Sequence, residues 1–343
     1  MMGMRWLIAL GLLATGAVAM GQTVDAAAAE AALAFLADVA AGRAWSVAAL
    51  QDLVGLPGHQ ALIAHHRRLD PAFSEVAFLQ MLLALQQGEP PPAGSPRLVR
   101  VYSAWQRAME DVPRVQESLG TLSIPLWVDR AVDQARRMLP AHVRIEATVY
   151  LVLDGRSPAY TVDSAVVLDI LSIPTGVWAL GALAHEFHHL GVQSLLPHPS
   201  CDDPALDQAL GLLVELVQEG SAQVLVDRRP CAASPEDFAR VGDLLQDALA
   251  GPLSAAEWAG RMASLLDPLA PSLYRVGCAV IAALVRAKGM GWVVERLGHP
   301  WTLVHTYQAV VDEDELRFPP AAVAELARCG GEGRCPEWLT VRE

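Results

Sequence analysis

The sequence predicts a mostly helical α+β protein in which a small antiparallel sheet separates two helical regions. Apolar residues recur at helical spacing through most of the 343 residues, and 53% of all residues are hydrophobic, enough for a substantial core. Two runs near the middle, 143–153 and 159–170, are instead rich in β-branched and aromatic residues. The periodicity changes there, so we expect a sheet with helical regions before and after it along the chain.

The chain begins with the features of a secretory signal. Arg5 gives a short positive region, residues 6–18 are apolar, and Ala17 and Ala19 fit a small-residue cleavage site. We therefore predict a signal peptide over residues 1–19 and an exported protein, periplasmic or secreted. Cleavage is favoured over an uncleaved anchor, because the apolar run is shorter than the roughly 20 residues that cross a bilayer. No membrane span is expected after cleavage, because Glu215 and Glu219 break the later apolar runs or Arg275 and Arg286 bound them.

Residues 20–140 are expected to form a helical N-terminal region. Helical spacing over 26–87 predicts about three helices, and the proline-rich stretch 88–96 predicts a surface loop. His65 and His66 lie in the helical part, but no acidic or cysteine residue stands nearby at the spacing of metal ligands. We therefore interpret this histidine pair as part of a surface helix.

The two β-rich runs come next, separated by the turn signal Asp154-Gly155. They predict two antiparallel strands placed directly before a long apolar run, 177–196. Pro197 ends that run, which we expect to be a helix.

The strongest chemical signal lies within this apolar run, where His185 and His189 stand four residues apart and Glu186 follows the first. This is the H-E-x-x-H pattern of zinc-dependent hydrolases. Residues i and i+4 share one face of a helix, so both imidazoles can reach a single ion. Glu186 can then hold the water bound to that ion.

A third ligand is expected from the segment that contains Glu215 and Glu219, which interrupt a helical apolar pattern. A buried carboxylate is costly unless a cation compensates it. Their spacing places both glutamates on one helix face, so the pattern leaves the choice between them open. Two histidines and one glutamate leave zinc a fourth position for water, as in catalytic sites.

The segment His185 to His189, followed by Glu219-Gly220-Ser221-Ala222, resembles the gluzincin clan of metallopeptidases. The resemblance is closest to zinc-dependent peptidase families that carry H-E-x-H-H and then E-G-x-A. It implies a zincin-like metallopeptidase region over residues 141–343. It also implies Zn²⁺ bound by His185, His189 and Glu219, with Glu215 as a supporting residue.

These observations predict an exported zinc metallohydrolase, and specifically a peptidase acting on a peptide or protein. Glu186 would be the general base, and Tyr274 and His305 are the candidates for a donor to the reacting carbonyl oxygen. The alternative is a non-catalytic, zinc-stabilised binding or scaffold protein, which would have no need of Glu186. A net charge of −13 and the lack of a basic patch argue against nucleic-acid binding.

The five cysteines make an odd count for an exported protein. Cys329 and Cys335 flank a glycine-rich loop and are predicted to form a disulfide. Cys278 is expected to be a buried, small apolar residue. Cys201 and Cys231 are expected to be too far apart to bond, because a long predicted helix separates them.

Overall fold

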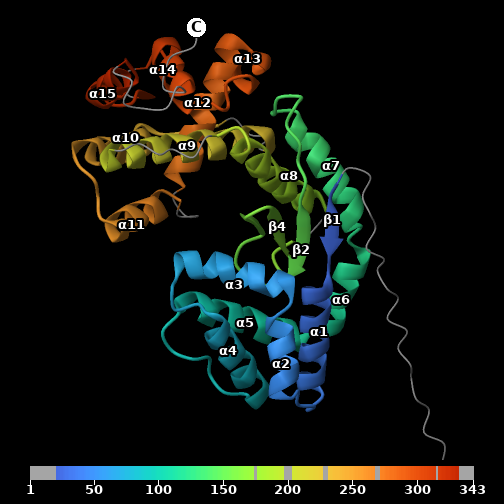
Figure 1. Ribbon diagram of the computed structural model, residues 1–343. Coiled ribbons are helices and arrows are strands. Elements are labelled where there is room, and N and C mark those ends of the chain that lie inside the picture. Colours follow the sequence, from blue (N-terminus) through green and yellow to red (C-terminus); the bar gives the residue numbers. More distant parts are fainter. Residues whose placement is uncertain are drawn as a thin grey trace, which may run out of the picture. The chain divides into compact units, whose positions relative to one another are not determined.

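The computed structural model describes residues 21–173, 176–196, 203–226, 231–266, 271–313 and 316–331. The predicted signal peptide and Cys335 of the predicted disulfide lie outside these residues. The chain is mostly helical with one small sheet, so the predicted fold class is confirmed. It divides into two compact units (Figure 1). Unit 1 comprises Met1–Asp129 and Glu146–Gly176, and unit 2 comprises Arg130–Ile145 and Val177–Glu343.

Unit 1 contains the N-terminal helices. Three of them begin at a serine whose hydroxyl accepts a hydrogen bond from the backbone N–H three residues later, at Ser46, Ser74 and Ser95. Gly88 ends one helix in the left-handed conformation, just before the predicted proline-rich loop. The helices are α1 (Ala27–Ala40), α2 (Val47–Val54), α3 (Pro57–Leu69), α4 (Glu75–Gln87), α5 (Pro96–Glu110), α6 (Val112–Thr121) and α7 (Ile124–Arg136), the last of which continues into unit 2.

The sheet of unit 1 is mixed, and in this respect the prediction of an antiparallel sheet was wrong. Its strand order is β1-β2-β4-β3. The pairs β1–β2 and β2–β4 are parallel, and only β3–β4 is antiparallel. The strands are β1 (Thr23–Asp25), β2 (Thr148–Val152), β3 (Ala159–Val162) and β4 (Ala165–Asp169).

The error arose at a turn inside the second β-rich run. Val162 pairs with Ala165, so Asp163 and Ser164 form a two-residue hairpin turn. Asp163 has a φ of 52°, a left-handed conformation that aspartate tolerates better than most residues. The run is therefore a hairpin, and its second strand lies parallel to β2.

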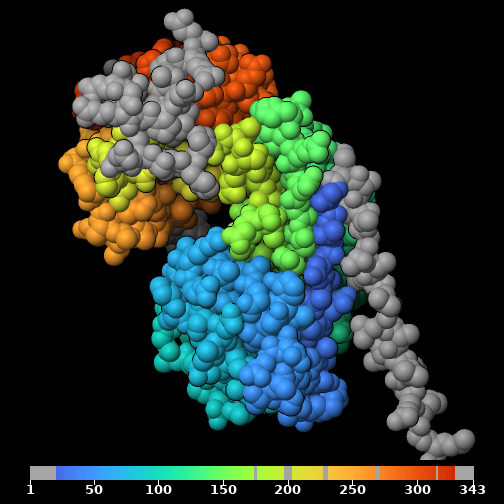
Figure 2. Space-filling model, in the orientation of Figure 1, coloured from blue at the N-terminus to red at the C-terminus, as the bar shows by residue number. Residues whose placement is uncertain are grey.

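The core of unit 1 is built around Trp105, which is fully buried. Its ring lies 5.8 Å from that of Phe78 and 6.3 Å from that of Phe35, measured between centroids. Its indole N–H donates to the carbonyl oxygen of Leu153 at 2.7 Å, which attaches α5 to the chain leaving β2. In the space-filling view the first helices of unit 1, in blue, form a continuous surface on the visible face (Figure 2).

Unit 2 is helical. Its most extensive helix pair is α9 with α12, and α10 packs against both (Figure 1). Among the described residues, α9 alone is long and apolar enough to cross a membrane, but 61% of its apolar window is buried within the protein. The helices are α8 (Gly176–Gln193), α9 (Pro204–Val226), α10 (Pro235–Ala250), α11 (Ala255–Leu265), α12 (Ser272–Lys288), α13 (Met290–Val294), α14 (Pro300–Val310) and α15 (Pro320–Gly331).

A disulfide joins Cys231 to Cys278, with their Cα atoms 5.4 Å apart. Cys278 is buried as predicted, but it is bonded to Cys231 and is not the free apolar residue that we expected. Cys231 lies shortly before α10, and α10 packs against α12, which carries Cys278. The sequence separation of 47 residues gave no sign of this proximity.

Candidate metal centre

Helix α8 positions the two histidines of the H-E-x-x-H pattern. Leu183, Phe187 and Val192 are fully buried and anchor the helix in the core of unit 2. His185 and His189 stand one turn apart on the same face. Their ring centroids are 4.4 Å apart, and their rings are nearly perpendicular at 87°. The helix thus presents two imidazoles side by side.

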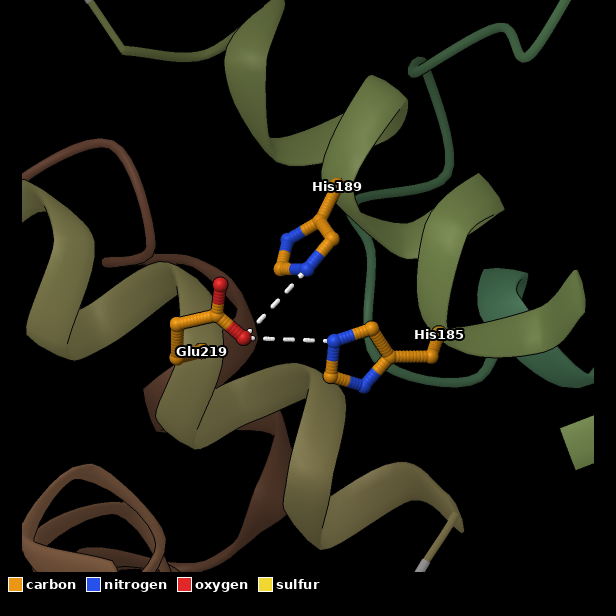
Figure 3. Close-up of side chains that lie close together, drawn as sticks. All are labelled: His185, His189 and Glu219. Atoms are coloured by element: carbon orange, nitrogen blue, oxygen red, sulfur yellow. Dashed lines mark hydrogen bonds and ion pairs between the residues drawn. The ribbon is translucent and has the colours of Figure 1, made fainter. Parts of the chain in front are cut away.

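Glu219 reaches the same point from α9 (Figure 3). Its Oε2 atom lies 3.2 Å from Nε2 of His185 and 3.4 Å from Nε2 of His189. The three candidate ligand atoms all lie within 4.8 Å of one another. Within the part of the chain that the structure describes, this is the one group of histidine, cysteine and acidic residues arranged to share an ion.

These distances fit zinc ligands better than they fit hydrogen bonds. A charge-assisted N–H···O⁻ bond is usually about 2.7–2.9 Å long, shorter than either contact of Glu219. With bonds of about 2.0–2.1 Å, the ligand atoms around tetrahedral zinc lie roughly 3.3 Å apart. The contacts of 3.2 and 3.4 Å match that separation. The donor set and its spacing therefore fit Zn²⁺.

The centre is largely buried and strongly acidic. The exposed fractions of the side chains are 14% for His185, 12% for Glu219 and 6% for His189. Burial opposes ionisation of Glu219, but the neighbouring imidazoles of His189 and His185 hold its pKa well below the usual range. Burial also lowers the pKa of His189, but Glu219, Glu186 and Glu215 outweigh this and raise it to about 9. The negative charges of Glu219, Glu186 and Glu215 therefore favour a positive charge at this centre.

The two glutamates between which the sequence left the choice open lie differently with respect to the imidazoles. Glu219 contacts both imidazoles, whereas Glu215, one turn earlier on α9, is not part of the ligand group. Burial and the charge of Glu219 raise the pKa of Glu215, while His189 lowers it. Glu215 is therefore a neighbour of the centre that acts through its charge.

Of the two candidate carbonyl donors, the structure brings Tyr274 to the centre. Its ring stacks on that of His185, with the ring centroids 6.2 Å apart. Burial and then the charge of Glu219 raise the Tyr274 pKa far above its ordinary value, so the hydroxyl keeps its proton. The ring of His305 packs against Trp301 on α14, and no interaction described for His305 joins it to the ligand group.

His188, whose role the sequence did not indicate, lies on the buried side of α8. Its Nε2–H donates to the carbonyl oxygen of Met138 at 3.3 Å. Burial, together with the charges of His189 and His185, lowers its pKa to about 3. His188 is therefore a neutral imidazole whose hydrogen bond holds the buried face of α8 against Met138.

Two glycines that the sequence analysis did not connect set the position of Glu219. Gly220 on α9 and Gly277 on α12 face each other so closely that a Cβ on Gly220 would lie 2.3 Å from the carbonyl carbon of Gly277. This contact fixes the helix carrying Glu219 against the helix carrying Tyr274. Glycines in the interior of two apolar helical patterns were the signal that could have revealed it.

Comparison with known proteins gives one match. The model of family DUF5700, described as "Putative zinc dependent peptidase", matches residues 50–316. That range is more than half of the chain and contains His185, His189 and Glu219. No curated protein and no solved structure matches the chain.

Proposed function

The chain belongs to this zinc-dependent peptidase family, and we propose that it is an exported peptidase with one Zn²⁺ bound by His185, His189 and Glu219. The observation that carries this proposal is the convergence of the three side chains at the ligand spacing of tetrahedral zinc. Three protein ligands leave one position for water, the arrangement of a catalytic rather than a structural site.

Glu186 is assigned as the general base. It lies beside His185 on α8, is 9% exposed, and interacts electrostatically with both His189 and Tyr274. When bound, Zn²⁺ would polarise the scissile carbonyl and lower the pKa of its water. The Glu186 carboxylate takes the proton from the attacking water and returns it to the leaving amine.

Tyr274 is assigned as the donor to the reacting carbonyl oxygen. Its ring stacks on that of the ligand His185, with the centroids 6.2 Å apart. Burial and the charge of Glu219 raise the pKa of Tyr274, so the hydroxyl keeps the proton that it would donate.

Two features support export of the protein. Residues 1–19 have the pattern of a cleavable signal peptide. The Cys231–Cys278 disulfide is of the kind that persists in oxidising compartments and is rare in the cytosol. We therefore propose a periplasmic or secreted enzyme.

The test is to measure zinc per chain and peptide hydrolysis for the purified wild type and Glu186→Gln. The variant should keep its zinc and lose about 10²- to 10⁴-fold in hydrolysis, the usual contribution of general acid–base catalysis. Glu117→Gln, the same change at an exposed site on α6, is the control and should match the wild type in both measurements.

Retained hydrolysis in Glu186→Gln would remove the assigned base. A wild-type chain that binds zinc but cleaves no peptide would instead favour the zinc-stabilised binding or scaffold protein.

A further inference from the structure

Unit 1 contains an open cavity of about 590 Å³. Its volume is in the range of sites that bind small molecules or short peptide segments. About half of its lining is apolar, with Ile170 and Ile173 forming a buried part. Its apolar side chains come from α5, α6 and the chain after β4, and they are Ala104, Ala108, Val115, Ile170, Leu171 and Ile173.

The cavity lies where open α/β sheets commonly bind ligands, outside the carboxyl ends of parallel strands. Gly155 follows β2 and residues 170–173 follow β4, and both line the cavity. Gly155 has a φ of 70°, and a Cβ there would lie 2.1 Å from the Cβ of Ala104. Only glycine allows α5 to approach the strand end and form this wall.

Two arginines, Arg107 on α5 and Arg114 on α6, also line the cavity. Both are exposed, and none of the ion pairs described in the structure includes either of them. Unpaired arginines in a chain of net charge −13 are available to an anion. The planar guanidinium group matches a carboxylate in geometry.

We propose that this cavity binds the C-terminal carboxylate of a peptide that ends in apolar residues. Arg107 and Arg114 contact the carboxylate, and the apolar lining takes the last side chains. Asp111, which caps α6, also lines the cavity and supplies an acceptor for peptide N–H groups. A fatty acid would offer Asp111 no donor, so the lining favours a peptide.

The experiment measures binding of a fluorescein-labelled hexapeptide that ends in Ala-Leu-Leu with a free carboxylate, by fluorescence anisotropy. The full chain carrying Glu186→Gln is used throughout, so that the peptide is not cleaved. The double variant Arg107→Ala/Arg114→Ala should bind the peptide at least about tenfold more weakly than the protein with the unaltered cavity. The protein with the unaltered cavity should bind the C-terminal amide of the peptide more weakly than the acid by the same factor. Arg100→Ala removes an exposed arginine of α5 that does not line the cavity, and it should bind normally.

If the double variant binds the peptide as tightly as the protein with the unaltered cavity, the proposal is overturned. The peptide would then bind elsewhere, for example at the metal centre. Equal binding of acid and amide would also overturn the proposal. Displacement of the peptide by dodecanoate at a lower concentration than the unlabelled peptide requires would reassign the cavity to fatty acids. None of these results depends on hydrolysis, so the inference and the proposed function can fail separately.

Discussion

Each unit buries histidine beside a carboxylate, but the two arrangements differ in geometry. In unit 1, Nε2 of His66 lies 2.9 Å from Oδ1 of Asp154, and both side chains are fully buried. In unit 2, one oxygen of Glu219 faces two imidazoles at 3.2 and 3.4 Å, and the side chains keep some exposure. The first contact has the length of an ordinary hydrogen bond, and the second has the spacing of ligands around an ion.

The comparison shows that a buried histidine–carboxylate pair does not by itself indicate a metal site. His66 and Asp154 join α3 to the end of β2 as one pair, so their role is structural. The interpretation of His66 as part of a surface helix was wrong, because its side chain is fully buried. The sequence did not indicate this burial, since the bonding partner Asp154 lies 88 residues later in the chain. What distinguishes the centre in unit 2 is the convergence of three donors.

The largest expected effect separates the two histidine sites directly. His189→Ala should abolish zinc binding and hydrolysis, because it removes one of three ligands. His66→Ala should keep zinc but lower the free energy of unfolding by about 3–5 kcal/mol, because it leaves the buried Asp154 without its partner. Zinc analysis after dialysis and denaturant unfolding measure the two effects. Zinc loss in His66→Ala with a folded unit 2 would contradict the distinction.

The next effect tests how the centre is held in place. Gly277→Ala should destabilise the protein by about 3 kcal/mol and weaken zinc binding, because overpacking forces α9 and α12 apart. The added Cβ would lie 2.3 Å from the carbonyl oxygen of Leu216. Gly211→Ala is the matched control on α9, where a Cβ meets nothing within 4 Å.

The control should be slightly more stable than the wild type, by about 0.5–1 kcal/mol, because alanine favours helix. Denaturant unfolding and zinc titration would measure both variants. Wild-type stability and zinc affinity in Gly277→Ala would show that the close helix contact is not required.

The third effect is a pH dependence that arises at His59 in unit 1. Burial lowers the pKa of His59 from 6.5 to about 4, although its hydrogen bond to Leu53 opposes this. Between these values the unfolded chain binds a proton that the folded chain does not, so stability falls as pH drops from 6.5 to 4. The contribution is about 3 kcal/mol at pH 4, from the size of the pKa shift.

Denaturant unfolding at several pH values, with His59→Gln for comparison, measures this contribution. The variant should lose less stability than the wild type between pH 7 and pH 4 by about the same amount. Parallel pH profiles for the two proteins would show that His59 does not titrate as described.

Local patterns were enough to predict the mostly helical fold and the helix that carries His185 and His189. The spacing of four residues between the two histidines can be read within a single segment. The apolar residues of that segment show which face of the helix is buried. Glu219 was expected from the family resemblance, and the structure places it against both histidines.

Features that depend on distant contacts were missed. The parallel pairing of Val24 with Val149 and the disulfide of Cys231 with Cys278 join segments whose local sequence does not identify their partner. The His66–Asp154 pair was missed for the same reason. Periodicity indicates which face of an element is buried, but not which segment covers it.

X-ray absorption at the zinc edge of the purified protein tests the central claim most directly. We expect one zinc per chain, with nitrogen and oxygen ligands at about 2.0–2.1 Å and the multiple-scattering signature of two imidazoles. A shell containing sulfur at about 2.3 Å, or a shell without imidazole scattering, would contradict this claim.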